Sequence, residues 1–507
     1  MVVIVMASAA FINAATYISY ASIPFVTSDG WYFIDAFLQK HYHGGVTLQD
    51  LYIKRSADDH AQPIQKLLLL WNAESFDLDF VIESYMGLAI AASAWVLMLH
   101  AARCDNRDRD RGAWWILPMT ASAASFVSLS GGMVFNWSLV TLGYLGPLAL
   151  IGLAMASWHA VRHGRWLALW LVAAAVAFTL DSAALICAIS IALALLILEA
   201  KQRGAGWRRT AAVVAVVAVS VVAYGVASRF YLHPHLADAA AGPSALSALR
   251  GFGAERLQQM VLSIAALSIS DRPALQFYVP AKAELLHRAA GLAVVAAHAW
   301  FWWRAWRDAW TRTQFIAVTL MLFCYGAVAG IVIGRVSMFG PDYVFQQRYL
   351  MLYQLGTVAV TLMAAGADWS AWRWPQRTLV GLGLLALVAI QWPLSKVTWA
   401  DAVYVQNYGN NLGREMILLG KDPTVRLASC APTLVICQAD RDEQVRSISL
   451  LRDHQLNAFS TQMLERYSME SLDADAGPVE LVDAPAPEGP LNEPQAAARS
   501  LSARQHG

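Results

Sequence analysis

The sequence predicts an all-α polytopic membrane protein with about eleven transmembrane helices. Of its 507 residues, 57% are hydrophobic and only 14% are charged, whereas soluble proteins carry about a quarter of charged residues. The apolar residues also fall in long runs, such as 183–198, 211–226 and 379–390. With their flanking residues these runs approach the roughly 17–25 residues that a bilayer span requires. The net charge of +1 gives no indication of nucleic-acid binding.

The apolar segments, in chain order, define the predicted spans. They cover residues 3–22, 81–100, 114–131, 134–157, 166–182, 183–199, 210–228, 286–303, 314–334, 347–365 and 378–394. The first segment begins at Met1 with no basic residues before it and no clear cleavage site after it. We therefore expect a retained helix rather than a signal peptide. The fifth and sixth segments predict a tight hairpin that is broken around Asp181 and Ser182.

The basic residues predict the orientation of these spans. They gather in the loops after the second, fourth, sixth, eighth and tenth helices: Arg103, Arg107, Arg109, Arg111; Arg162, Arg165; Lys201, Arg203, Arg208, Arg209; Arg304, Arg307, Arg312; Arg373, Arg377. All five loops fall on one side of an eleven-helix bundle, and the turn 130–137 on the other side has no Lys or Arg. The positive-inside rule then makes the basic side and the N-terminus cytoplasmic.

Outside the predicted bilayer the chain divides into loops and a tail. The transmembrane domain covers residues 1–395. Its first extracytoplasmic loop, residues 22–80, is too long for a simple connector. A second excursion, residues 229–285, contains a helical pattern that suits the membrane interface. Residues 396–470 predict a small extracytoplasmic appendage. Residues 471–507 are rich in Ala, Pro, Glu and Asp, which predicts a disordered tail.

Cys430 and Cys437 both lie in the predicted appendage. If the appendage is extracytoplasmic, a disulfide between them would persist in that oxidising space. The alternative interpretation is two unpaired small core residues.

Asp29 is the first candidate for chemistry. It stands about seven residues beyond the first span, beside Trp31 and Tyr32, and aromatic residues of this kind anchor at the membrane interface. A carboxylate at that depth could accept a proton from a hydroxyl group or hold a divalent cation. Ser28-Asp29-Gly30 is also good turn chemistry, so a purely structural role stays open.

The second candidate is the run Asp58-Asp59-His60. Two carboxylates and an imidazole supply a base, a charge partner and possible metal ligands. No second His or Cys has a fitting spacing, so no metal site is predicted here. The run also precedes an amphipathic helix that extends through Trp71, and an Asp at that position serves equally well as a helix cap.

Two late arginines form the third candidate. Arg335 ends the ninth predicted helix, and Arg348-Tyr349 begins the tenth. Guanidinium groups bind phosphate with paired hydrogen bonds, so the two could hold a lipid phosphate or pyrophosphate. Snorkelling to lipid headgroups explains either residue equally well. Asp181 and Glu83 are further acids whose depth the sequence leaves open between an intramembrane site and a helix end.

In this order the motifs resemble those of C-type (GT-C) glycosyltransferases, and are similar to uncharacterised bacterial members related to surface-glycan assembly. The resemblance covers about residues 20–365. It rests on Asp29-Gly30-Trp31-Tyr32-Phe33, Asp59-His60-Ala61-Gln62-Pro63 with Lys66, Asn136-Trp137, Arg335 and Arg348-Tyr349. Two positions depart from the pattern: Ala61 stands where relatives often have Arg, and Val134-Phe135 stands where an acid is expected.

The resemblance implies an enzyme of the bacterial inner membrane with a periplasmic tail. Such enzymes take a sugar from a polyprenyl-phosphate donor at the outer face and pass it to a glycan, lipid or protein acceptor. It implies Asp29 as base or acceptor-orienting acid, with Asp59 and His60 as further catalytic candidates. The implied substrate-binding residues are Trp31, Lys66, Asn136, Trp137, Arg335, Arg348 and Tyr349. Some members use a metal, so a divalent cation stays open as a cofactor.

Three other functions fit parts of the sequence. A polysaccharide polymerase or ligase usually has its main outer loop late in the chain, whereas here the large excursions are early and central. A transporter or flippase would need polar residues at mid-depth in several spans, and few are present. In a scaffold without catalysis, Asp29 would be replaceable.

Overall fold

The computed structural model describes residues 2–54, 60–107, 113–202, 206–232, 251–425, 427 and 430–469. Over these residues the protein is all-helical and has no strands, so the predicted all-α class is confirmed. Seven helical segments are long and apolar enough to cross a membrane: Val3–Ala21, Phe80–Arg107, Ser138–His163, Ala183–Lys201, Trp207–Leu232, Arg312–Phe339 and Trp374–Lys421. They correspond to seven of the eleven predicted spans and indicate a multi-pass membrane protein.

The helices of the bundle follow the predicted apolar runs. They are α1 (Val2–Ala21), α5 (Phe80–Arg107), α6 (Ile116–Phe126), α7 (Met133–Asn136), α8 (Ser138–Thr141), η3 (Leu142–Tyr144), α9 (Leu145–His163), α10 (Trp166–Leu180), α11 (Ser182–Lys201), α12 (Trp207–Ala227), α16 (Ala283–Arg307), α17 (Arg312–Ile331), α19 (Leu350–Ala365) and α20 (Trp374–Lys421). Thus α6, α10, α16 and α19 are the helices found at the four remaining predicted spans. The predicted helix 134–157 is interrupted near its start, where α7, α8 and η3 are short separate turns.

Shorter helices form the excursions from the bundle. The first loop contains α2 (Gly30–Tyr32), η1 (Phe33–Leu38), α3 (Gln39–Gly44), η2 (Leu48–Tyr52) and α4 (Pro63–Phe76). The second contains η4 (Ser228–Leu232), α14 (Gly253–Leu267), α15 (Arg272–Tyr278) and η5 (Pro280–Lys282). Between α17 and α19 lie η6 (Val332–Val336), α18 (Ser337–Phe339), η7 (Pro341–Phe345) and η8 (Gln347–Tyr349), and η9 (Trp369–Ala371) precedes α20. The appendage contains η10 (Val435–Gln438), α21 (Arg441–Asp453), η11 (Asn457–Phe459) and α22 (Thr461–Arg466).

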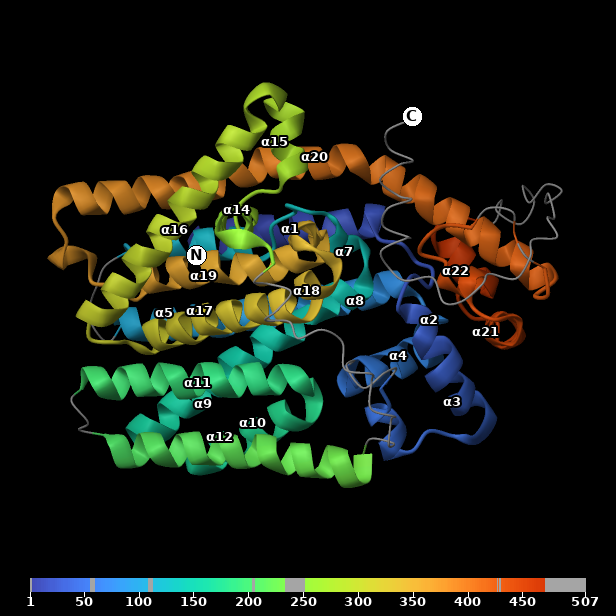
Figure 1. The fold of residues 1–507 in the computed structure, drawn as a ribbon, viewed down its shortest axis with the longest axis horizontal. Helices are drawn as coiled ribbons and strands as arrows, with labels where there is room; N and C mark the ends of the chain where they lie inside the picture. Colours follow the sequence, from blue (N-terminus) through green and yellow to red (C-terminus); the bar gives the residue numbers. More distant parts are fainter. Residues whose placement is uncertain are drawn as a thin grey trace.

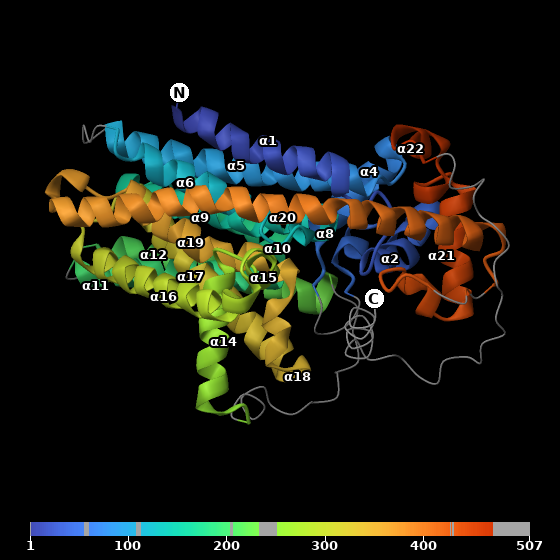
Figure 2. The same ribbon diagram turned by 90° about the horizontal axis from the view of Figure 1, so that it is seen from above.

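The bundle runs along the longest axis of the molecule, and its connections gather at two opposite ends (Figure 1). The C-terminal ends of α11, α16 and α19 lie together at one end, which we call the basic end. The helices α2, α3, α4, α21 and α22 lie together at the other end, which we call the loop end (Figures 1 and 2). The loop end thus contains helices of the first predicted excursion and of the predicted appendage.

Helix α20 is much longer than predicted, because it continues past Pro393 to Lys421 as one helix of 48 residues. At 1.5 Å per residue it is about 72 Å long, more than twice the roughly 30 Å thickness of a bilayer core. Its exposed Trp374 and Trp392 (76% and 71% exposed) are about 27 Å apart along the helix, because each residue rises 1.5 Å. Tryptophans favour the two membrane interfaces, so this spacing favours a membrane-crossing first part and a protruding second part.

The protruding part of α20 carries the appendage, which packs against the first loop. Trp31, Phe37 and Leu69 of the first loop share one hydrophobic core with Leu412 of α20 and Leu451 of α21. The structure also contains the predicted disulfide between Cys430 and Cys437, whose Cα atoms are 6.4 Å apart. The appendage is therefore part of the loop end rather than a separate body.

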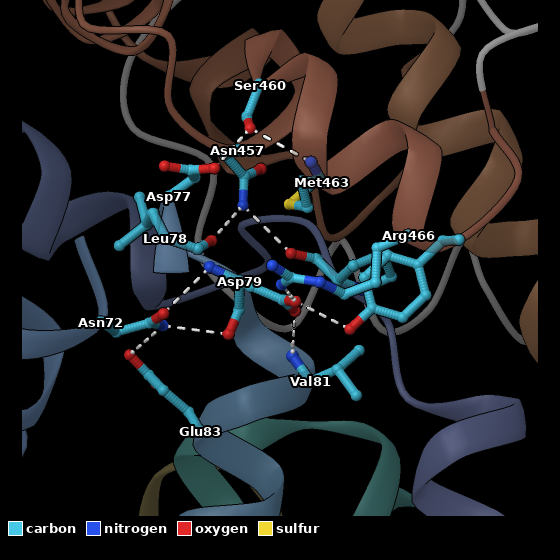
Figure 3. A network of polar contacts seen from close by, with 12 residues as sticks. Asn72, Asp77, Leu78, Asp79, Val81, Glu83, Asn457, Ser460, Met463 and Arg466 are labelled. Carbon is cyan, nitrogen blue, oxygen red and sulfur yellow. Dashed lines mark hydrogen bonds and ion pairs between the residues drawn. The ribbon is translucent and has the colours of Figure 1, made fainter. Parts of the chain in front are cut away.

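A buried polar network completes this docking (Figure 3). The Asn457 side chain donates to the carbonyl oxygens of Pro24 (3.0 Å) and Leu78 (2.6 Å). The Asp79 carboxylate, which is fully buried, accepts from Arg466 Nη1 (2.6 Å) and Tyr467 OH (2.8 Å). Both ends of the first loop, where it leaves α1 and where it enters α5, are thus bonded to residues 457–467 of the appendage.

Candidate functional site

The turn between α6 and α9, residues 127–137, lies at the meeting point of the loop end and the bundle. Ile23, just after α1, donates its backbone N–H to the Asn136 carbonyl oxygen (3.3 Å). The Thr398 hydroxyl of α20 donates to the Leu129 carbonyl oxygen (2.5 Å). The Asp271 N–H donates to the Ser130 hydroxyl oxygen (3.0 Å). We call residues 127–137 the central turn, because it contacts α1, α15 and α20 at once.

The predicted pair Asn136-Trp137 is in this turn. Asn136 is half-buried and ends α7, and Trp137 adopts an extended conformation that separates α7 from α8. The buried Trp137 Nε1 has no hydrogen-bond partner among the described residues. A buried N–H group without an acceptor raises the free energy of the folded protein, so a ligand oxygen that accepts from it would be stabilised here.

Arg348 lies against two tyrosine rings, and Arg335 is in the neighbouring segment η6, whose Val336 shares a hydrophobic core with Val344 and Leu350. The Arg348 guanidinium carbon is 5.3 Å from the centre of the Tyr349 ring and 5.7 Å from that of Tyr343, and Arg348 Nη2 donates to the Tyr343 hydroxyl. The two arginines, thirteen positions apart in the chain, thus lie on neighbouring segments.

The segment before α19 and the start of α19 pack against the central turn. Gly131 has a positive φ of 77°, which glycine adopts without strain. A Cβ atom at this position would lie 2.8 Å from Leu350 Cδ2 and 3.6 Å from Gln347 Cβ, so the turn approaches the start of α19 very closely. The structure thus brings the segment of Arg348 and Tyr349 to the turn of Asn136 and Trp137, which are four of the ten predicted site residues. Arg335 lies on the neighbouring segment η6.

Asp29 is held on the neighbouring loop, six residues after Ile23. It is half-buried and precedes α2, but its side chain does not cap that helix. The Ser28 N–H donates to the Thr433 carbonyl oxygen (2.7 Å), and the Thr433 side chain is bonded to the Tyr408 hydroxyl (2.6 Å). The contacts that fix the Asp29 turn thus come from the appendage and α20.

Two predicted binding residues have structural surroundings instead. Lys66 is only 1% exposed, and its ammonium group donates to the carbonyl oxygens of Asp50 (3.1 Å), Leu51 (3.1 Å) and Ile53 (2.6 Å). Trp31 is 2% exposed and belongs to the core shared with the appendage. For both residues, this burial favours a role in holding the first loop over the predicted contact with substrate.

Of the predicted acid–histidine motif, the structure describes only the histidine and the residues after it. Asp58 and Asp59 lie outside the described residues, and His60 is exposed. The adjacent Ala61 N–H donates to Asp181 Oδ2 (2.9 Å), and Asp181 also accepts from the Tyr224 hydroxyl (2.7 Å). Asp181 therefore anchors the first loop to the α10–α11 turn, and Glu83 likewise accepts from Asn72 (3.1 Å) inside the network of Figure 3.

Sequence reasoning missed a cavity at the loop end. A space of about 380 Å³ lies between the end of α1, the protruding part of α20 and residues 466–469. Its polar lining includes Gln406, Asn410, Arg414 and Arg466, and none of the ten predicted residues. The chain positions are too far apart for a local motif to reveal them. Among the described residues, no group of three His, Cys, Asp or Glu side chains is placed to hold a metal ion.

Comparisons of the chain with protein-family profiles, with curated proteins and with solved structures find no match.

Proposed function

We propose that this protein is a glycosyltransferase of the bacterial inner membrane. In this proposal it crosses the membrane eleven times, has its N-terminus and basic end in the cytoplasm, and has its loop end in the periplasm. There it moves a sugar from a polyprenyl-phosphate donor to a glycan, lipid or protein acceptor of the cell surface. The observation that carries the proposal is the packing of the Arg348–Tyr349 segment beside the central turn, with Arg335 on the neighbouring segment η6.

The proposed roles follow from charge. The two guanidinium groups bind the phosphate oxygens of the donor, where charge-assisted hydrogen bonds are strongest. Asp29 takes the proton of the acceptor hydroxyl while its oxygen forms the new bond to the sugar carbon. The bond from that carbon to the phosphate oxygen breaks, and the lipid phosphate leaves. A divalent cation stays open as a cofactor, and the proposed step is carried by the residues named above.

Binding of the lipid is tested with a synthetic polyprenyl phosphate. The purified full-length protein should retain this lipid in native mass spectrometry, and the Arg335→Gln/Arg348→Gln double variant should lose at least about tenfold of that retention. Asp342→Gln, at an exposed acid of the same region, is the matched control and should bind like the wild type. Equal retention by the double variant would remove the phosphate role of the two arginines.

Catalysis is tested separately at Asp29. The Asp29→Asn variant, expressed at normal level in the membrane, should lower surface-glycan transfer by a factor of about 10² or more, the usual contribution of a general base. Normal lipid retention with full transfer activity in this variant would remove Asp29 as the base. Such a result would favour a transferase, polymerase or ligase that uses another base.

A further inference from the structure

A second cavity, of about 750 Å³, lies at the basic end, opposite the candidate site. The end of α16 contributes Trp303, Arg304 and Arg307, and the segment before α20 contributes Trp372 and Arg373. Figures 1 and 2 both show the α16–α17 and α19–α20 turns at this end of the bundle. The volume is within the range of about 300–1,000 Å³ that is typical of small-ligand sites.

The walls of this cavity carry more positive than negative charge. Arg304, Arg307 and Arg373 are opposed by two acids, Asp308 and Asp368. Asp308 is paired with Arg304, with Nη2 and Oδ2 2.5 Å apart. Arg307 and Arg373 make no ion pair with any described residue. A ligand in this cavity therefore meets two guanidinium groups whose charge the described protein does not neutralise.

Two buried hydrogen-bond donors also lack acceptors here. Trp372 is 5% exposed, and its Nε1 has no hydrogen-bond partner among the described residues. The same is true of Arg304 Nε, although this guanidinium is nearly buried and its carbon lies 4.8 Å from the centre of the Trp372 ring. Buried donors without acceptors are costly, and an oxygen-rich anion would satisfy both. The cavity is therefore suited to phosphate.

The surrounding tryptophans place the cavity at the depth of lipid headgroups. Trp303, Trp306 and Trp374 are all exposed around it. Exposed tryptophans gather at membrane–water interfaces, where the phosphates of the bilayer also lie. We propose that this cavity binds the phosphate-bearing headgroup of an anionic phospholipid. The site lies at the other end of the bundle from Asp29 and the arginine pair, so it does not depend on the proposed glycosyl transfer.

The test uses the full-length protein in nanodiscs that contain phosphatidylcholine and phosphatidylglycerol. After extraction into detergent, native mass spectrometry should show phosphatidylglycerol retained by the wild type. Arg307→Gln should lower that retention roughly tenfold, because it removes charge-assisted hydrogen bonds. Trp372→Phe removes a single N–H group and should lower retention less. Arg208→Gln changes an exposed arginine of the same end, outside the cavity lining, and serves as the matched control.

Three outcomes would overturn the proposal. One is equal retention of phosphatidylglycerol by the wild type, Arg307→Gln and Trp372→Phe. Another is an equal loss in Arg208→Gln, which would show a general attraction of the basic end for anionic lipid. The third is binding of inorganic phosphate in detergent with no preference for phosphatidylglycerol over phosphatidylcholine, which would identify a free anion as the ligand.

Discussion

At the scale of single residues, Lys66 holds three backbone carbonyl groups in place. Lys66→Met keeps most of the side-chain volume but removes the donors. Buried carbonyl groups left without a donor cost about 1–3 kcal/mol, so the thermal midpoint in detergent should fall, and amide exchange across residues 47–54 should rise. Lys282→Met, at an exposed position, is the control. If Lys66→Met had the same thermal midpoint as the wild type, the structural role would be wrong, and Lys66 would be available for the predicted substrate contact.

The contact between the appendage and the first loop should depend on pH, because it contains the buried Asp79 carboxylate. Burial raises its pKa, and the hydrogen bonds from Tyr467 and Arg466 oppose this rise. For an acid whose folded pKa is raised, the contribution to stability is present at low pH and is lost as the pH rises through that pKa. Arg466→Gln removes one of the opposing groups, so it should raise the pKa of Asp79 further.

The Arg466→Gln variant should therefore be less stable than the wild type at neutral pH. The difference in thermal midpoint should shrink as the pH is lowered, across a series between about pH 5 and 8. The loss should be modest, about 1–3 kcal/mol, because Arg466 is partly exposed and solvent screens the pair. A difference that stays constant over the whole series would show that Asp79 is not the titrating group.

At the scale of elements, the contact between α20 and η11 leaves no room for a side chain at Gly420. A Cβ atom there would lie 2.1 Å from Phe459 Cε1 and 2.6 Å from Cζ. Gly420→Ala should therefore loosen the appendage by about 1–3 kcal/mol, the usual cost of overpacking, and raise amide exchange across α21 and α22. Gly383→Ala on the same helix has open space around the new methyl group and should have no such effect.

The elements also show what the sequence could predict. Each of the eleven predicted apolar runs coincides with a helix, and seven of these helices are long and apolar enough to cross a membrane, because hydrophobicity is the dominant signal of a span. The same signal ended the last helix at residue 394 instead of Lys421, because it reports where the bilayer ends and not where helical hydrogen bonding ends. The contacts of Asn457 with Pro24 and Leu78 were not predictable, since they join positions that are hundreds of residues apart.

The candidate site was predictable only in part, for the same reason. Residue type suggested phosphate binding for Arg335 and Arg348, but only the fold places the Arg348–Tyr349 segment beside the central turn, with η6 next to it. Residue type also suggested that Lys66 binds substrate. The sequence pattern could not reveal that three carbonyl groups of its own loop surround the ammonium group.

At the scale of the whole molecule, the orientation in the membrane is the prediction on which the proposed function depends. Gly44 at the loop end and His163 at the basic end are both exposed, and a side chain at Gly44 meets no other atom within 4 Å. In a Cys104→Ser background the remaining free cysteines, Cys187 and Cys324, are buried. Gly44→Cys should then react with an impermeant thiol reagent in intact cells, and His163→Cys only after lysis. The opposite pattern would place the loop end in the cytoplasm and remove the proposed transfer at the periplasmic face.

The protruding part of α20 sets the rotational phase of the appendage as well as its height. Each helical residue adds about 100° of rotation and 1.5 Å of rise. Deleting one residue between Lys396 and Tyr404 would turn Arg466 and Asn457 away from their partners on the first loop. Deleting seven residues would nearly restore the angle but lower the appendage by about 10 Å. The length of this helix is therefore constrained by both rotation and rise, because the appendage must also meet its partners on the first loop.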